Sequence, residues 1–207
     1  MASAARKSHV TPEEYLASER KATEKHEYDA GWVIAMAGAS RRHNLIAVNL
    51  LSAFHLGLKD RPCEVYGGDM RVEVEATGLY TYPDVTITCD GPRFGDPEFD
   101  TLLNPTVIVE VLSPSTESRD RGRKFAHYRR LESLREYVLV SQERVLVERF
   151  TRQGDEWVLT EFGRDDDLLR LASVGVEIPV REIYAKVRFE EPGPVETAGT
   201  SSPILPA

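Results

Sequence analysis

The stretch TVIVEVLS, Thr106 to Ser113, decides the fold, because its near-continuous run of Val and Ile is typical of a strand buried on both faces of a sheet. Side chains alternate along a strand, so the three valines face one side and Glu110 shares the other side with Ile108 and Leu112. A buried glutamate is rare unless it is paired or bound to a metal ion. The stretch therefore predicts a central strand with an acid that has a partner.

A second acid stands at an unusual place in TYPDVTITC, Thr81 to Cys89. Val85 and the residues after it favour a strand, whereas an ionised Asp84 inside a core strand is unfavourable unless its charge is compensated. Taken singly, Asp84 is well explained as a turn cap, because Asp bonds nearby backbone N–H groups. Glu110, taken singly, is equally well an edge residue or half of a buried ion pair.

Two more acids belong with these, although Asp69 alone is read as a bulge residue and Glu27 alone as a helix-end charge. Neighbouring strands lie only ~5 Å apart, so Asp84 and Glu110 on successive strands can converge on one point. Carboxylates that close repel each other, and one of them holds a proton unless a cation lies between them. Several oxygen ligands together suit Mg²⁺ or Mn²⁺.

Periodicity and turn signals divide the rest of the chain. They predict a mixed central sheet flanked by helices, of the α/β or α+β class, in a single domain over residues 11–189, with a flexible start at 1–10 and a disordered tail at 190–207. The expected helices are residues 12–25, 41–58 and 121–131; the expected strands are 32–37, 63–74, 77–89, 106–113 and 135–142, then a hairpin at 144–162 and a short strand and helix up to 187.

Composition narrows the class of protein. The 207 residues, 41% hydrophobic and 29% charged, predict a soluble domain, and a net charge of −8 argues against a protein that coats nucleic acid through bulk charge. No apolar run approaches a membrane span and no apolar leader is visible, so a cytoplasmic location is expected. Cys63 and Cys89 form no metal-binding pattern and are expected to be small buried side chains in a reducing compartment.

An ordered set of sequence blocks resembles the Uma-type restriction endonuclease family of the PD-(D/E)xK nuclease superfamily. The blocks are TPEEYL, HEYDAG, MAGAS with HN after it, GGDMRV, YTYPDVTI, NPTVIVEVLSPST, DRGRKFAHYRRL and EYVLV, between Thr11 and Val187. The resemblance implies a restriction-endonuclease-like core and a Mg²⁺- or Mn²⁺-dependent endonuclease that hydrolyses phosphodiester bonds in DNA. It also suggests a homodimer, since restriction-type enzymes commonly cut both strands as dimers.

The resemblance also implies roles for particular residues. Asp84 and Glu110 would be metal-binding acids, together with the main-chain carbonyl of Val111, and Asp69 and Glu27 would complete an acidic pocket. The superfamily's lysine normally lies two residues after the second acid, where this chain has a leucine. In the Uma-type branch the lysine lies on the following helix, and Lys124 matches it. It would hold the attacking water or stabilise the transition state.

A basic rim beside the acids would contact the phosphate backbone, with Arg41, Arg42, Arg121 and Arg123 as its candidate residues. A solvated charged face explains the same arginines. His43 and His127 are expected to be structural rather than catalytic. Two alternatives to an endonuclease stay open: a catalytically inactive nuclease-fold module that binds nucleic acid or a protein, and a metal-dependent hydrolase of a small phosphoester.

Overall fold

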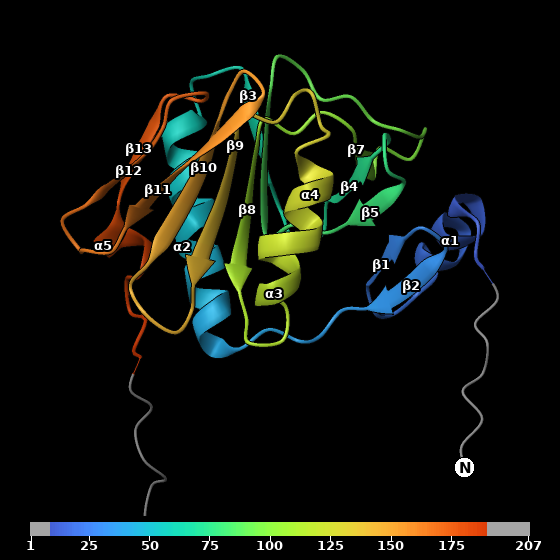
Figure 1. Ribbon diagram of the computed structural model, residues 1–207, viewed down its shortest axis with the longest axis horizontal. Coiled ribbons are helices and arrows are strands. Elements are labelled where there is room, and N and C mark those ends of the chain that lie inside the picture. The colour runs from blue at the N-terminus through green and yellow to red at the C-terminus, as the bar shows by residue number, and fades with distance from the viewer. Residues whose placement is uncertain (1–8, 190–207) are drawn as a thin grey trace, which may run out of the picture.

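A central six-stranded sheet organises the computed structural model, which describes residues 9–189 (Figure 1). Its strands are β3 (Cys63–Gly67), β6 (Val85–Cys89), β8 (Val107–Leu112), β9 (Glu136–Ser141), β10 (Val147–Gln153) and β11 (Glu156–Phe162). They lie in the order β11-β10-β9-β8-β6-β3, and within this sheet β8 and β9 form the parallel pair. The expected central strand and the expected hairpin are both confirmed.

A second sheet of five strands holds β1 (His26–Asp29), β2 (Trp32–Ala35), β4 (Arg71–Val74), β5 (Leu79–Thr81) and β7 (Thr101–Leu102), in the order β2-β1-β5-β4-β7. A small third sheet pairs β12 (Leu168–Leu171) with β13 (Val176–Pro179). The helices are α1 (Pro12–Glu19), α2 (Arg41–Leu58), α3 (Glu117–Arg119), α4 (Phe125–Tyr128) and α5 (Val180–Ile183). Mixed sheets with flanking helices confirm the predicted α+β class.

Two expected strands are each broken into two. The segment 63–74 turns at Gly68 into β3 and β4, and the segment 77–89 breaks at Pro83 into β5 and β6, so each contributes to both larger sheets. Proline cannot donate a ladder hydrogen bond, and a glycine pair allows a sharp change of direction. The expectation of two continuous strands was wrong. The breaks place Asp84 at the point where the chain enters the six-stranded sheet.

The central sheet is covered on both faces, with α2 behind it and α3 and α4 in front of β8 in Figure 1. All six residues of β8 are buried. Its valines pack with the buried side of α2, while Ile108 and Leu112 pack with residues around α4. The buried stripe of α2 consists of Ile46, Leu50, Phe54 and Leu58. Glu110 thus faces the layer of α3 and α4.

The helix expected at 121–131 begins earlier and is not uniform. It starts at Glu117 and passes through a π-helical turn, Asp120–Lys124, before the single α-helical turn of α4. π turns are rare and occur frequently at functional sites. This one carries two buried charged residues, Asp120 and Lys124. The first helix, by contrast, ends at Glu19 and not near Lys25, and His26 already belongs to β1.

A disulfide joins Cys63 and Cys89 across the antiparallel pair of β3 and β6, where the register places them directly opposite each other. The expectation of two unpaired cysteines was wrong. The residues are 26 positions apart in sequence, and only the strand register brings them together. Disulfides persist mainly in oxidising compartments. The cysteines therefore no longer favour the expected cytoplasmic location, which stays a prediction.

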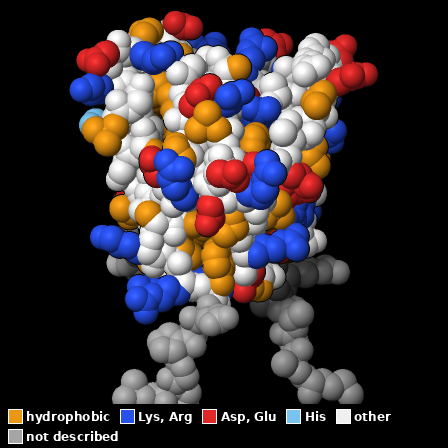
Figure 2. Space-filling view, turned by 90° about the vertical axis from the view of Figure 1, so that its left-hand side faces the viewer, with side chains coloured by type: hydrophobic (Ala, Val, Ile, Leu, Met, Phe, Trp, Pro, Cys, Tyr) orange, Lys and Arg blue, Asp and Glu red, His pale blue; other side chains and the backbone are white. Residues whose placement is uncertain are grey.

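The predicted disordered tail at 190–207 and most of the predicted flexible start at 1–10 lie outside the described residues. The single domain over residues 11–189 also stays a prediction. Within residues 9–189, no helix is long and apolar enough to cross a membrane. Figure 2 shows acidic and basic side chains interspersed over one face, with hydrophobic side chains between them, and no broad surface of one sign.

Candidate functional site

The ammonium group of Lys124 lies among three buried carboxylates. Its Nζ is 2.9 Å from Oε1 of Glu27, 3.1 Å from Oε1 of Glu110 and 3.2 Å from Oδ1 of Asp120. All four side chains are almost completely buried. The sequence predicted that this lysine would reach the acids from the helix after β8, and the structure brings Lys124, Glu110 and Glu27 together.

The surrounding elements hold these acids in place. Glu27, on β1, accepts hydrogen bonds from the hydroxyl of Thr81 and from the guanidinium of Arg119. Glu110, on β8, accepts a 2.8 Å hydrogen bond from the Tyr128 hydroxyl at the same Oε1 that contacts Lys124. The contacts of Glu110 with other described residues therefore all go to one oxygen. Among the described residues, no hydrogen bond or ion pair reaches its second oxygen.

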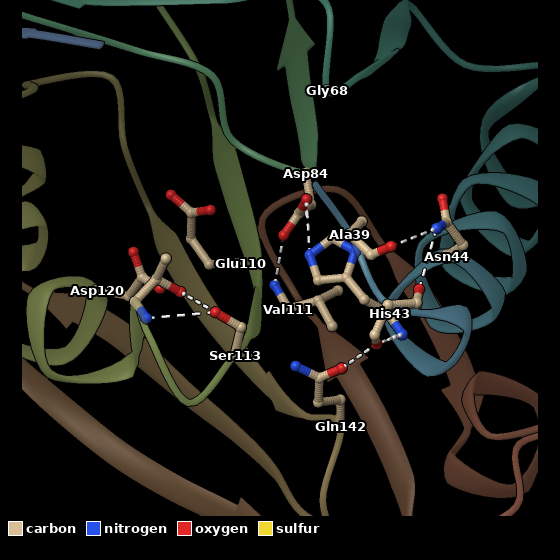
Figure 3. A network of polar contacts seen from close by, with 12 residues as sticks. Ala39, His43, Asn44, Gly68, Asp84, Glu110, Val111, Ser113, Asp120 and Gln142 are labelled. Atoms are coloured by element: carbon tan, nitrogen blue, oxygen red, sulfur yellow. Dashed lines mark hydrogen bonds and ion pairs between the residues drawn. The ribbon is translucent and has the colours of Figure 1, made fainter. Parts of the chain in front are cut away.

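Asp84 lies beside this cluster, immediately before β6 (Figure 3). Its Oδ2 accepts a 2.7 Å hydrogen bond from the backbone N–H of Val111, which fixes it against β8 next to Glu110. Its Oδ1 lies 3.2 Å from Nε2 of His43, and its side chain is 21% exposed. Asp84 is thus the acid of the group that has access to solvent.

The charges of the cluster shift the pKa values of its members. Burial alone raises the pKa of Glu27, but Lys124, with Thr81 and Arg119, outweighs it and holds the Glu27 pKa below its usual value. Burial and the neighbouring acids raise the pKa of Glu110 to about 8, although the charge of Lys124 opposes this rise. Burial lowers the pKa of Lys124, but its three carboxylates raise it well above normal, so the amine stays protonated.

His43 lies in the first turn of α2, whose N-cap residue, Ser40, accepts a 3.1 Å hydrogen bond from the His43 backbone N–H. The Ser40 hydroxyl in turn donates to the buried side chain of Gln142 at the end of β9. Burial lowers the pKa of His43, but the hydrogen bond and the charge of Asp84 together raise it above its usual value. His43 is therefore positioned as a hydrogen-bond partner of Asp84.

The site gathers four carboxylates with one lysine, one arginine and one histidine. Lys124 contacts Glu27, Glu110 and Asp120, the Arg119 guanidinium bonds Glu27, and His43 pairs with Asp84. Carboxylate oxygens are the ligands that Mg²⁺ and Mn²⁺ prefer. Within the described part of the chain, no three acid, histidine or cysteine side chains already surround one point as metal ligands. The metal therefore remains a proposal.

Asp69 does not join the cluster. It lies in the turn between β3 and β4, where its side chain is 98% exposed and pairs with Lys25 at 2.8 Å. Gly68 approaches the backbone of Asp84 closely, so the turn is near the site while the Asp69 carboxylate is not part of it. The expectation that Asp69 completes the acidic pocket was wrong.

The predicted basic rim is largely neutralised within the protein. Arg42 pairs with Glu143, Arg121 with Glu117 and Glu148, and Arg123 with the buried Asp29. Arg41 is exposed and forms no ion pair with any described residue. His127 bonds the hydroxyl of Thr77 and lies 3.9 Å from Asp29, as expected for a structural histidine. Three of the four rim arginines thus already have carboxylate partners.

Sequence reasoning missed Asp120 and Tyr128. Asp120 stands four residues before Lys124, the spacing of side chains on one helical face, and this was the available signal. Tyr128 stands four residues after the lysine, and its hydroxyl reaches Glu110. Nothing in the sequence distinguished Tyr128 from an ordinary tyrosine of the hydrophobic core.

Comparison with known proteins identifies the family. A family model, Uma2, with the description "Putative restriction endonuclease", matches residues 12–181. The chain belongs to the Uma2 family. Two uncharacterised proteins of Synechocystis are similar to this Uma2 protein: slr1290 is 38% identical over 181 residues, 87% of this chain and 94% of the relative. The other, sll1609, is 40% identical over 153 residues, 73% of this chain and 86% of the relative.

A solved structure shares the fold of this Uma2 protein. It is the crystal structure of a protein from Anabaena variabilis described as a putative nuclease belonging to DUF820. The TM-score is 0.67 at 18% sequence identity, and the match covers 84% of this chain and 97% of that chain. The match confirms the predicted fold.

Proposed function

We propose that this Uma2 protein is a metal-dependent endonuclease that hydrolyses phosphodiester bonds in DNA. The observation that carries the proposal is the Lys124 ammonium group, which lies among Glu27, Glu110 and Asp120 beside the partly exposed Asp84. Membership of a family with the description "Putative restriction endonuclease", and a structural neighbour described as "a putative nuclease", support the same reaction class.

Asp84 and Glu110 would hold Mg²⁺ or Mn²⁺, together with the main-chain carbonyl of Val111. When bound, the metal lowers the pKa of a water molecule and neutralises charge on the phosphate. The protein's own residues prepare the site for it. Val111 N–H and His43 orient Asp84, and Tyr128 and Lys124 orient Glu110 through one of its oxygens. Lys124 would supply fixed positive charge beside these acids, where negative charge develops on the phosphate.

A second candidate function is a catalytically inactive nuclease-fold module that binds nucleic acid or a protein. One observation favours it: Lys124 already has three carboxylate partners, as a purely structural buried ion network would have. Such networks are retained in proteins without any catalytic role. Asp84 opposes this alternative, because it is oriented by two partners and still reaches solvent.

The deciding experiment is a cleavage assay on supercoiled plasmid, linear duplex, single-stranded DNA and RNA, each with Mg²⁺, Mn²⁺ or EDTA. We expect metal-dependent cleavage of DNA that is lost in Asp84→Asn and Glu110→Gln and retained in Asp60→Asn, an exposed acid outside the site. Binding of Mn²⁺ by calorimetry should weaken in the same two variants. Absence of cleavage on every substrate would favour the inactive module. Equal cleavage by all variants would contradict the proposed roles of Asp84 and Glu110.

We further propose that the protein acts as a homodimer in the cytoplasm. Two-fold symmetric pairing is the commonest assembly, and it gives a nuclease two sites for the two strands of a duplex. Light scattering of the purified protein measures the assembly, and a twofold mass is the expected result. Fractionation of the native cells measures the location.

A further inference from the structure

A pocket of about 410 Å³ lies between the C-terminal end of α4 and the turn that joins β10 to β11. Arg129 and Arg130 line it from the helix end, and Arg152 and Trp157 from the two strands of the hairpin. Asp155 is the acid in this lining. The pocket is therefore basic in a protein whose net charge is −8.

The arginines of this pocket differ from those beside the acidic cluster. Arg119, Arg121 and Arg123 each bond a carboxylate. Within residues 9–189, the three pocket arginines form no ion pair at all. Like charges gathered without a partner repel each other, and an anion between them removes that repulsion. Of the arginines between residues 119 and 130, the first three are thus neutralised by carboxylates, and Arg129 and Arg130 are open to a ligand.

Arg152 is held rigidly in the pocket. Its Nη2 donates to the backbone carbonyls of Arg129 at 2.7 Å and Leu131 at 2.8 Å, and its guanidinium lies over the indole of Trp157 at 4.8 Å. Its Nε is buried and has no partner among the described residues. Burial and the nearby charge of Arg135 lower its pKa, against the opposing effect of Asp155 and Glu132. A guanidinium fixed in this way loses little conformational entropy when it binds an anion.

The pocket and the acidic cluster lie toward opposite ends of the same strands. Glu110 is level with Leu139 on β9, which in turn pairs with Glu148 on β10. Arg152 lies four residues beyond Glu148, which is roughly 13 Å along the sheet at the usual rise of a strand. Phosphates along one strand of duplex DNA repeat at about 3.4 Å of axial rise, so this separation corresponds to roughly four nucleotides.

We propose that the pocket of Arg129, Arg130 and Arg152 is a phosphate-binding site distinct from the acidic cluster. Resting on the proposed nuclease function, we assign its ligand as a backbone phosphate of the nucleic acid substrate, a few nucleotides from the bond at the acids. Arginine matches phosphate oxygens through paired N–H donors, and a phosphodiester needs no recognition of the base. The pocket would position the strand and leave the chemistry to the acids.

The test measures binding without cleavage. Labelled single-stranded and duplex DNA are titrated with protein in EDTA, and fluorescence anisotropy gives the affinity. The exposed pair is replaced in Arg129→Gln/Arg130→Gln, and Arg181→Gln is the matched control, an exposed arginine on α5 without an ion pair among described residues. We expect the double variant to bind DNA about tenfold more weakly and the control to bind like the wild type. Circular dichroism checks that the variants are folded.

Separate arms distinguish the sources of phosphate. Inorganic phosphate and a nucleoside monophosphate are titrated by calorimetry into the wild type and the double variant. Pocket-dependent binding of these small ligands without DNA binding overturns the nucleic acid assignment. Equal DNA binding by wild type and double variant, or equal loss in Arg181→Gln, overturns the site itself. If DNA binding depends on the pocket but no metal-dependent cleavage occurs, the phosphate-binding site is supported and the proposed nuclease function is contradicted.

Discussion

Lys124 does not stand at the superfamily's usual lysine position in the sequence, but its ammonium group still contacts the acids of the site. From the π-helical turn, Lys124 reaches the face of β8 that carries Glu110, while Leu112, at the usual lysine position, packs into the core. The sequence predicted this meeting because Asp84, Glu110 and Lys124 matched motif positions. It did not predict the hydrogen bonds of the cluster, since those depend on where β1 and α2 pack in space.

Replacing Lys124 by methionine tests the ion network. The change keeps the length of the side chain but leaves three buried carboxylates without their shared cation. We expect a loss of roughly 3–5 kcal/mol in the free energy of unfolding, the usual effect of breaking a buried ion pair, together with loss of nuclease activity. Urea denaturation measures the first effect. Lys59→Met, an exposed residue at the C-cap of α2, is the control, and equal stability of the two variants would contradict the network.

Asp69→Asn tests the correction to the predicted acidic pocket. Its carboxylate is solvent-exposed and its ion pair with Lys25 is also exposed, so we expect a stability change of about 0–1 kcal/mol and nuclease activity equal to that of the wild type. The cleavage assay decides the point. If this variant loses activity as Asp84→Asn does, the sequence-based assignment was right and the turn moves on substrate binding.

At the scale of elements, the sequence predicted which segments are strands better than where they end. The run of β8 was recognisable because burial on both faces leaves only apolar residues beside Glu110. The break at Pro83 was missed because the alternation of Leu79, Val85 and Ile87 continues across it. At Gly68 the alternation changes phase between Val65 and Met70, but the segment was still expected to be one strand. In α2 the i, i+3, i+4 spacing of Leu45, Val48 and His55 predicts a buried stripe, yet Val48 is 57% exposed. Which face of a helix is buried depends on its neighbours, and here α5 and the central sheet select Ile46 and Leu50.

The disulfide between β3 and β6 is expected to stabilise the folded protein. Cys63→Ser/Cys89→Ser removes a crosslink that closes a loop of 26 residues, and the chain-entropy relation gives a loss of about 3.5 kcal/mol in the free energy of unfolding. Guanidinium denaturation with and without dithiothreitol measures it. The reductant should destabilise the wild type and leave the double variant unchanged. A wild type that is insensitive to reductant would show that the two thiols are not joined.

At the scale of the whole molecule, net charge and local charge act in opposite directions on DNA. The chain carries −8, and many of its arginines are neutralised by carboxylates, as at Arg121 and Arg123. The face in Figure 2 mixes both signs. Bulk electrostatics therefore repels DNA, and attraction must come from the pocket arginines and from cations at the acids.

The salt dependence of DNA binding follows from this balance. Each phosphate contact on duplex DNA contributes about −0.9 to the slope of log Kobs against log salt, so three pocket arginines predict a slope near −3, where a protein with a broad basic surface gives −6 to −9. Arg129→Gln/Arg130→Gln should bring the slope to about −1, because each lost contact removes about one unit. Anisotropy titrations over a range of KCl concentrations in EDTA measure both slopes. A wild-type slope of −6 or steeper would mean that a wider surface binds the backbone. An unchanged slope in the double variant would mean that the contacts lie outside the pocket.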